Sequence, residues 1–483
     1  MLGKKDRWQE DLFMVGTLGD LVPEDHPLRQ IDRVLDLSWL REQVRDLYCP
    51  DNGRPSLDPE VAMRLEIAGV VEGITKSRAL MRQAQVNVAI RWFVGYRLHE
   101  TLPDHSSLSV TRRRWGRDRF RQLLERTIRQ CLDAGLVGGK TLHVDATLIR
   151  ADVSWDSLIR QHVEEASADA DTDGSPDGDD PQPKRKGRPT SKPPRTKRVS
   201  RTDPEATMAT SSREFHLQPT YKQHTAVDDQ AGIIVDVEVT TGEASEGKEL
   251  CDVIDRVEAV LDTQIETVTA DAGYAHGANY EALEEREITS VIPPPRPSRR
   301  KSQTLPSQRF KYDAKADVVR CPRGRTLHPS TKTEHGRTYR AKRKDCKTCP
   351  LAGRCLSKTA TVRTVHIGHG YVALLRARRE HLRGWSDEKR ALYTRHRWQV
   401  EGVHGESKAV HGLHRAARRG TANVQIQSYL TAAVINLKRL AKHASAKWSD
   451  SGPASRPRSQ DGPIHAAQCP CETPRAQLLK KAA

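Results

Sequence analysis

Two aspartates and a glutamate are the side chains of this sequence whose setting could support chemistry. Asp145 lies inside the apolar run HVDATLI, Asp271 ends the apolar run VTA, and Glu401 lies in a late helical segment. Buried carboxylates must be paired or bound to a metal ion. Mg²⁺ prefers a few carboxylates, several waters and substrate phosphate oxygens, and Mn²⁺ takes the same oxygen ligands. The three acids therefore indicate a divalent-cation site that acts on a phosphate-bearing substrate.

The two aspartates also have a simpler interpretation. A lone aspartate in a strand usually points to solvent on the polar side of an alternating pattern. Two features weigh against this here, because both stretches are strongly apolar and each aspartate is followed by turn or loop residues. Sites in α/β sheets form at the carboxyl ends of strands. We therefore expect Asp145 and Asp271 to share one site.

The charge of the chain favours a polyanionic partner. Its 483 residues carry a formal net charge of +17, and the pI is about 9.5. Since each neutralised phosphate releases counterions, such an excess favours nucleic acid, although some basic proteins simply tolerate their charge. No apolar run is long enough for a membrane span, and the N-terminus lacks the apolar core of a signal peptide. We expect a cytoplasmic protein that does not bind membranes.

The elements that must position the acids follow from the pattern of apolar residues. Up to about residue 130 the spacing is helical, and Asp58 before Pro59 and Glu60 is typical of a capped helix start. Beyond Gly138, paired strands are followed by alternating strands and helices, which predicts an α/β layer with a mixed sheet. The expected parts are a helical domain over 1–135, a core over 138–295, a Cys-rich insert over 296–360, a second core part over 361–444, and a disordered tail over 445–483.

A charged insert interrupts the first part of the core over residues 156–212. Residues 156–180 hold nine acidic side chains, and residues 181–201 hold nine basic side chains and no acid. Such blocks bury too little apolar surface to offset the entropy of ordering, so we expect disorder. The basic half could contact the DNA backbone or serve as a plain linker.

Clustered arginines mark the end of the helical domain. Five of them lie close together on one predicted helix: Arg112, Arg113, Arg114, Arg117 and Arg119. Such a run is usually a solvated helix face. In a chain of this charge, a helical bundle that displays arginines also suits DNA contact, which is the interpretation we prefer.

Four of the nine cysteines lie in the basic insert. Cys321, Cys346, Cys349 and Cys355 have the spacing C-x24-C-x2-C-x5-C. A C-x2-C pair with further thiols nearby suits tetrahedral structural Zn²⁺, although the pattern is not a full double-knuckle ribbon. Reduced free thiols packed in a small subdomain are the alternative.

Three sequence blocks resemble a known family. HVDATLI, TADAGY and RHRWQVEGVHGESK are similar to the catalytic blocks of bacterial insertion-sequence DDE transposases, and Arg397, Glu401 and Lys408 match the Arg-x3-Glu-x6-Lys spacing of the third block. The family often has a tyrosine three residues before that arginine, where this chain has Thr394 next to Tyr393. The segment from Ser77 to Trp115 also resembles the helical domain of one large insertion-sequence group, and the Cys-rich insert is typical of a subgroup.

The resemblance implies a ribonuclease-H-like fold and a two-metal mechanism. Asp145 would bridge two Mg²⁺ or Mn²⁺ ions, with Asp271 and Glu401 each completing one site. Water would free a 3′-hydroxyl at the end of the element, and that hydroxyl would attack target DNA. Lys408 could hold a phosphate, and Arg397 could orient Glu401 or merely pair with it along the helix.

The resemblance also implies partners and leaves rival functions open. The partners would be double-stranded DNA with terminal inverted repeats, target DNA, and a second copy of the chain on the bacterial nucleoid. A non-catalytic DNA-binding regulator descended from a transposase and a ribonuclease-H-like nuclease are the alternatives. His143 and His404 lie near two of the acids, but we expect them to pack or to meet solvent. Trp398, beside the glutamate, is expected in the core, with base stacking as a weaker alternative.

Overall fold

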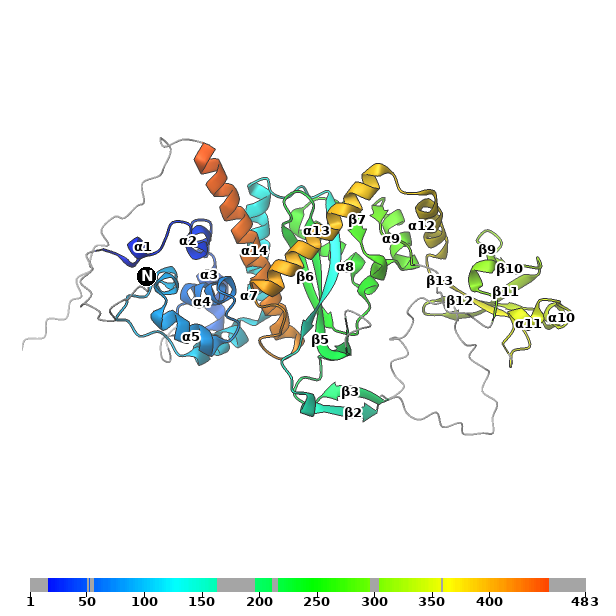
Figure 1. Ribbon diagram of the computed structural model, residues 1–483, viewed down its shortest axis with the longest axis horizontal. Helices are drawn as coiled ribbons and strands as arrows, with labels where there is room; N and C mark the ends of the chain where they lie inside the picture. Colours follow the sequence, from blue (N-terminus) through cyan, green and yellow to red (C-terminus); the bar gives the residue numbers. More distant parts are fainter. Residues whose placement is uncertain are drawn as a thin grey trace, which may run out of the picture. The chain divides into compact units, whose positions relative to one another are not determined.

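The computed structural model describes residues 16–49, 52, 56–162, 196–210, 216–295, 304–357 and 359–450 (Figure 1). The chain divides into the units 1–441 and 442–483, and of the second only the end of the last helix is described. Most of the predicted tail therefore lies outside the described residues. Among the described helices, none is both long enough and apolar enough to cross a bilayer.

The N-terminal domain consists of helices, as its apolar spacing predicts. Asp58 caps α4 by accepting a hydrogen bond from the Glu60 N–H at 2.8 Å, and Asp104 caps α7 through the Ser106 N–H at 2.8 Å. Both carboxylates satisfy backbone donors that a helix start leaves free. The helices are α1 Leu18–Leu21, α2 Pro27–Asp32, α3 Leu40–Val44, α4 Pro59–Val71, α5 Ser77–Val86, α6 Val88–Val94 and α7 His105–Asp133.

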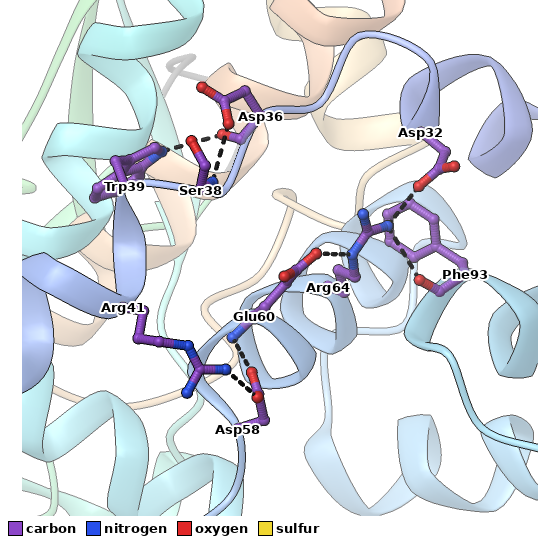
Figure 2. Close-up of polar contacts among 9 residues, drawn as sticks. All are labelled: Asp32, Asp36, Ser38, Trp39, Arg41, Asp58, Glu60, Arg64 and Phe93. Atoms are coloured by element: carbon purple, nitrogen blue, oxygen red, sulfur yellow. Dashed lines mark hydrogen bonds and ion pairs between the residues drawn. The ribbon is translucent and has the colours of Figure 1, made fainter. Parts of the chain in front are cut away.

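Arg64 ties three of these helices together. Its guanidinium donates to Asp32 of α2 at 2.5 Å, to Glu60 of α4 at 2.9 Å, and to the Phe93 carbonyl of α6 at 3.1 Å (Figure 2). The Arg64 guanidinium also lies over the Phe93 ring, 5.0 Å from its centroid. One planar, five-donor side chain thus fixes the relative positions of short helices that would be marginal alone.

A mixed sheet forms the α/β core, which confirms the expected ribonuclease-H-like fold class. The strand order is β4-β5-β1-β7-β8, and β6 also pairs with β5. Strand β5 is antiparallel to β1 and β6, whereas β7 is parallel to β1 and β8. The strands are β1 Thr141–Arg150, β4 Thr207–Ala209, β5 Gln218–Asp228, β6 Ile234–Thr241, β7 Thr267–Ala270 and β8 Thr289–Val291.

Helices from both halves of the chain cover this sheet. Helix α13 crosses it and contacts β1, β5, β7 and β8, while α7 and α8 pack against β6 (Figure 1). A single buried apolar cluster includes residues of the helical domain, the sheet and the last helix. The helices are α8 Leu250–Leu261, α9 Gly277–Glu285, α12 Tyr371–Arg383, α13 Asp387–Ala409 and α14 Thr421–Asp450.

Two amide side chains of α14 complete the outer side of β6. Among the described strands, β6 pairs only with β5, so its other backbone groups need partners. Asn436 accepts from the Ile234 N–H and donates to the Ile234 carbonyl, both at 2.9 Å. Gln425 accepts from the Val239 N–H at 2.7 Å and donates to the Val237 carbonyl at 2.9 Å. Side chains thus take the place of a neighbouring strand.

The predicted charged insert is ordered at both ends. Strands β2 (Leu158–His162) and β3 (Thr196–Ser200) form a two-stranded antiparallel ribbon, and β4 joins the main sheet. The expectation of disorder over 156–212 is therefore wrong at these ends, because short strands there find backbone partners that composition does not reveal. Residues 163–195, which hold most of the charge, lie outside the described residues.

The Cys-rich insert forms its own five-stranded antiparallel sheet, in the order β13-β12-β11-β10-β9. Because β13 belongs to this sheet, the insert extends past the predicted end at residue 360. The elements are β9 Lys311–Asp313, β10 Val318–Arg320, β11 Thr326–Thr333, β12 Gly336–Ala341, α10 Arg343–Lys347, α11 Ala352–Cys355 and β13 Thr364–Gly368.

A buried ion cluster joins the helical domain to the core. Glu66 of α4 pairs with Arg112 of α7, and Arg418, which follows α13, approaches the same carboxylate at 3.8 Å. Arg112 also donates to the hydroxyls of Ser77 and Ser109, each at 3.0 Å. Only 4% of Arg112 and 8% of Glu66 is exposed. We call Glu66, Arg112 and Arg418 the Glu66 cluster.

Candidate active site

The register of two parallel strands makes Asp145 and Asp271 neighbours. In the β1–β7 pair, Val144 lies opposite Ala270, which is the last residue of β7. One residue further along, the chain reaches Asp145 on one side and Asp271 on the other. Asp271 leaves the sheet as the cap of a short turn and accepts from the Gly273 N–H at 2.7 Å. The two carboxylates thus come from adjacent positions of the sheet.

Asp145 departs from the expectation in one respect. It is not at a strand end, because β1 continues through Arg150. Its partner β7 stops at Ala270, so the site forms where the neighbouring strand ends. Asp271 therefore follows the rule that sites form at strand ends. Asp145 belongs to the site because it lies beside the end of the neighbouring strand β7.

The Asp145 carboxyl is partly buried among other acids, with 24% of its side chain exposed. Burial is the largest cause of a pKa raised to about 7, and the charges of Asp271, Glu246 and Glu401 add to it in that order. The pKa of Asp271 is also raised, first by burial and then by the charge of Glu246. A bound cation would offset the repulsion between these crowded carboxylates. The donor set therefore fits a divalent cation.

Glu401 approaches the aspartates from α13 and remains largely open to solvent. Its side chain is 66% exposed, and Arg397 Nε lies 3.9 Å from Glu401 Oε1, which is the helical ion pair considered from the sequence. Within the described part of the chain, no three Asp, Glu, His or Cys side chains converge closely enough to hold one metal ion. The structure brings the three acids into one neighbourhood without gathering them at coordination distance.

Buried neutral histidines lie on β1 and α13, and one of them, His404, lies beside Asp145. His404 Nδ1 is 3.8 Å from Asp145 Oδ2, and its Nε2 is 3.1 Å from Thr225 Oγ1. Burial lowers the pKa of His404 to about 3 and that of His396 to about 4, and it also lowers the pKa of His143. These rings are therefore uncharged near neutral pH, and both histidines named from the sequence pack inside. Nothing in the sequence singles out His396.

Lys408 and Tyr393 face the acids from the same helix. Burial lowers the pKa of Lys408, and the charge of Asp145 opposes that shift. The pKa of Tyr393 is raised by burial and then by the charge of Asp271. Thr394 instead donates its hydroxyl to a carbonyl of its own helix at 2.9 Å. Tyr393, displaced by one position from the family pattern, is thus the residue that lies toward the acids.

The expectation that Trp398 belongs to the core is wrong. Its side chain is 65% exposed on α13, between Arg397 and the turn that carries Glu401. A helix that crosses a sheet buries one side only, and Trp398 lies on the other. An open aromatic face beside two charged residues suits stacking on a base.

The arginine run on α7 divides between the interior and the surface. Arg112 is committed to the Glu66 cluster, so its guanidinium is not available to DNA. Arg113 and Arg114 are exposed, and the Arg114 guanidinium lies 4.4 Å from the centroid of the Tyr48 ring. Consecutive helical residues point about 100° apart, so three in a row cannot share one face.

The four cysteines of the insert lie near one another, directly after β10 and within or between the short helices α10 and α11. Cys321, Cys346 and Cys355 pack against the apolar core of the insert. Burial raises the pKa of Cys355, and the nearby thiols of Cys346, Cys349 and Cys321 raise it further. Like the acids, these described thiols do not converge in a group of three that could hold a metal ion.

Comparison with protein families matches two stretches of the chain. Residues 16–114 match a family described as Transposase domain (DUF772), and residues 197–437 match the Transposase DDE domain. The second stretch includes Asp271 and Glu401 and begins after Asp145, whose place rests on the β1–β7 register. No curated protein matches the chain. The helical domain before a ribonuclease-H-like core, the neighbouring aspartates and both family matches agree: the chain belongs to the DDE transposases.

Proposed function

We propose that this transposase cleaves DNA at the ends of an insertion sequence and joins those ends to target DNA, with Mg²⁺ or Mn²⁺ as cofactor. The observation that supports this most is that Asp145 and Asp271 are neighbours in the sheet and that the charge of Glu401 raises the pKa of Asp145. Acids that raise one another's pKa are costly to a folded protein unless a ligand uses them. Phosphodiester chemistry with two cations uses such a set.

Each residue of the site has a proposed task. Asp145, Asp271 and Glu401 would hold the ions, which supply charge stabilisation at phosphorus and an activated nucleophile. Lys408, which lies near Asp145, contacts a phosphate oxygen as a point charge. His404 is placed to orient the Asp145 carboxylate while bonded to Thr225.

Exposed side chains on two helices form the proposed DNA contacts. Arg113 and Arg114 on α7 would bind backbone phosphates, and Arg397 on α13 would do so beside the acids. Trp398 would stack on a base near the cleavage point. Because two ends must be joined to one target, we propose that two copies of the chain assemble on DNA.

The experiment that tests this function uses the full chain and labelled duplexes. The substrates carry the DNA on either side of the reading frame, where we expect terminal inverted repeats, and reactions contain Mg²⁺, Mn²⁺ or a chelator. We expect cation-dependent nicking that leaves a 3′-hydroxyl, and joining of pre-cut ends to a plasmid. Cleavage without joining would instead indicate a nuclease. Specific binding of the ends without either reaction would indicate a regulator.

We also propose that the Cys-rich insert holds one structural Zn²⁺. The proposal is supported by the proximity of four thiols in one small subdomain, where three of them raise the pKa of Cys355. We expect about one zinc per purified chain by elemental analysis, because four-thiolate sites are closed and bind tightly. Cys349→Ser should remove the metal, whereas the control Cys251→Ser, on α8, should retain it. Wild-type protein that contains no zinc after zinc-supplemented expression would favour reduced free thiols.

A further inference from the structure

Glu246 places a fourth carboxylate next to Asp271. It lies in a short 3-10 turn, Glu246–Lys248, that joins β6 to α8. A Cβ added to Gly273 would lie 2.1 Å from Glu246 Oε2 and 2.9 Å from Asp271 Oδ1. The two oxygen atoms are therefore separated by no more than the sum of these distances. Two turns that are distant in sequence thus bring their carboxylates to the same glycine.

The charge of Glu246 acts on both aspartates. Among the charges that raise the pKa of Asp145, Glu246 ranks ahead of Glu401, and it is the first charge that raises the pKa of Asp271. The charge of Glu246 therefore affects the Asp145 carboxyl more than the charge of Glu401, the glutamate of the family pattern, does. Glu246 thus belongs to the acidic group by position as well as by charge.

One lysine partly balances this group. Lys222 Nζ lies 3.1 Å from Glu246 Oε1 and donates to the Ala244 carbonyl at 2.6 Å. Its side chain is 12% exposed and that of Glu246 is 28% exposed. A nearly buried ammonium needs such a partner. Lys222 and Lys408, which lies near Asp145, still leave the four carboxylates of Asp145, Asp271, Glu246 and Glu401 in excess.

We propose that Glu246 binds the divalent cation that Asp271 binds, and that Lys222 is its counter-ion when no cation is present. The inference rests on the proposed function, because it places Glu246 at the same cation site. Mg²⁺ is held in proteins by one or two carboxylates together with waters and phosphate, so a close carboxylate pair suffices for one ion. The rival interpretation is a purely structural ion pair that fastens the β6–α8 turn to β5.

Mn²⁺ titration of the metal-free full chain, without DNA, separates the two interpretations. Binding is followed by calorimetry and by the electron paramagnetic resonance signal of free Mn²⁺. We expect Glu246→Gln to weaken binding by roughly 10-fold or more, as loss of a metal-site partner does. Lys222→Met should strengthen binding several-fold, because it removes the competing cation. Glu243→Gln, an exposed neighbour on the same loop, is the matched control and should bind as the wild type does.

The opposite signs of the two changes decide the outcome. A gain in Mn²⁺ affinity for Lys222→Met cannot result from misfolding, but loss of the Lys222 charge alone would also favour a cation at Asp271. The gain therefore supports the proposal when Glu246→Gln weakens binding in the same Lys222→Met background. A structural pair predicts a lower Tm for both variants and unchanged Mn²⁺ affinity on Glu246→Gln in either background, and that result would overturn the proposal. Asp271→Asn completes the set. If it weakens Mn²⁺ binding while Glu246→Gln does not, only this inference fails; if neither variant changes binding, the proposed cation site fails as well.

Discussion

Replacing Asp145 by Asn is expected to abolish DNA cleavage and, at the same time, to stabilise the metal-free protein at alkaline pH. The isosteric amide cannot provide the charge that holds a cation, so cleavage should fall by about 10³-fold or more, which corresponds to a loss of roughly 4 kcal/mol of transition-state stabilisation. End binding should persist, because Arg113 and Arg114 are unchanged. Cleavage and mobility-shift assays on the same duplexes measure the two effects.

The gain in stability follows from the raised pKa of Asp145. An acid whose pKa is higher in the folded state loses stability as pH rises from its unfolded value of about 4 to its folded value of about 7. The penalty is complete above pH 7, and Asn removes it. At roughly 1.4 kcal/mol per pKa unit, the gain is at most about 4 kcal/mol at pH 8 and vanishes near pH 4.

Urea denaturation across this pH range tests the prediction, with Asp252→Asn as the control. Asp252 is exposed on α8, so its variant should cleave normally and show no such pH-dependent gain. The raised pKa also predicts that cation binding by the wild type weakens as pH falls below 7. An Asp145→Asn protein that cleaves at the wild-type rate, or that is less stable than the wild type at pH 8, would contradict the proposed site.

Removing Arg112 is expected to destabilise the protein severely, unlike removing its neighbour. Arg112→Ala leaves the Glu66 carboxylate buried with only Arg418 at 3.8 Å, and breaking such a pair from one side costs about 3–5 kcal/mol. Arg113→Ala should change the free energy of unfolding by less than about 0.5 kcal/mol, because this side chain is exposed. Urea denaturation of the two variants gives the comparison.

DNA binding should respond in the opposite way. Arg113→Ala should weaken binding at low salt and reduce the slope of affinity against salt by about one unit, as expected for one lost phosphate contact. Arg112→Ala should leave that slope unchanged under conditions where the protein stays folded. A stable Arg112→Ala protein with a reduced salt slope would show that Arg112 contacts DNA, as the sequence suggests.

Local patterns in the sequence predict the elements of this protein well. The cap at Asp58, the strand that carries Asp145 and the helix that carries Glu401 all follow from spacing and side-chain type over a few residues. These features depend on hydrogen bonds and apolar periodicity within one segment. The fold class could be predicted because the order of such segments restricts how they can pack.

The remaining features depend on contacts between distant segments. Whether Arg112 or Arg113 is buried is decided by Glu66, 46 residues away from Arg112 on another helix. Trp398 looks like a core residue by type, yet the side of α13 that meets the sheet excludes it. Glu246 lies in a turn without any motif, and only the approach of the Gly273 turn brings it to Asp271. No spacing rule within one segment encodes these three outcomes.

The amide side chains of α14 along β6 have a consequence for shortened chains. A polypeptide that ended before Thr421 would lack Gln425 and Asn436, so the outer backbone groups of β6 would have no partner from that helix. An open, Val-rich strand edge recruits strands from other molecules. Premature termination would therefore yield an aggregation-prone polypeptide, and loss of the last helix should be seen first as insolubility.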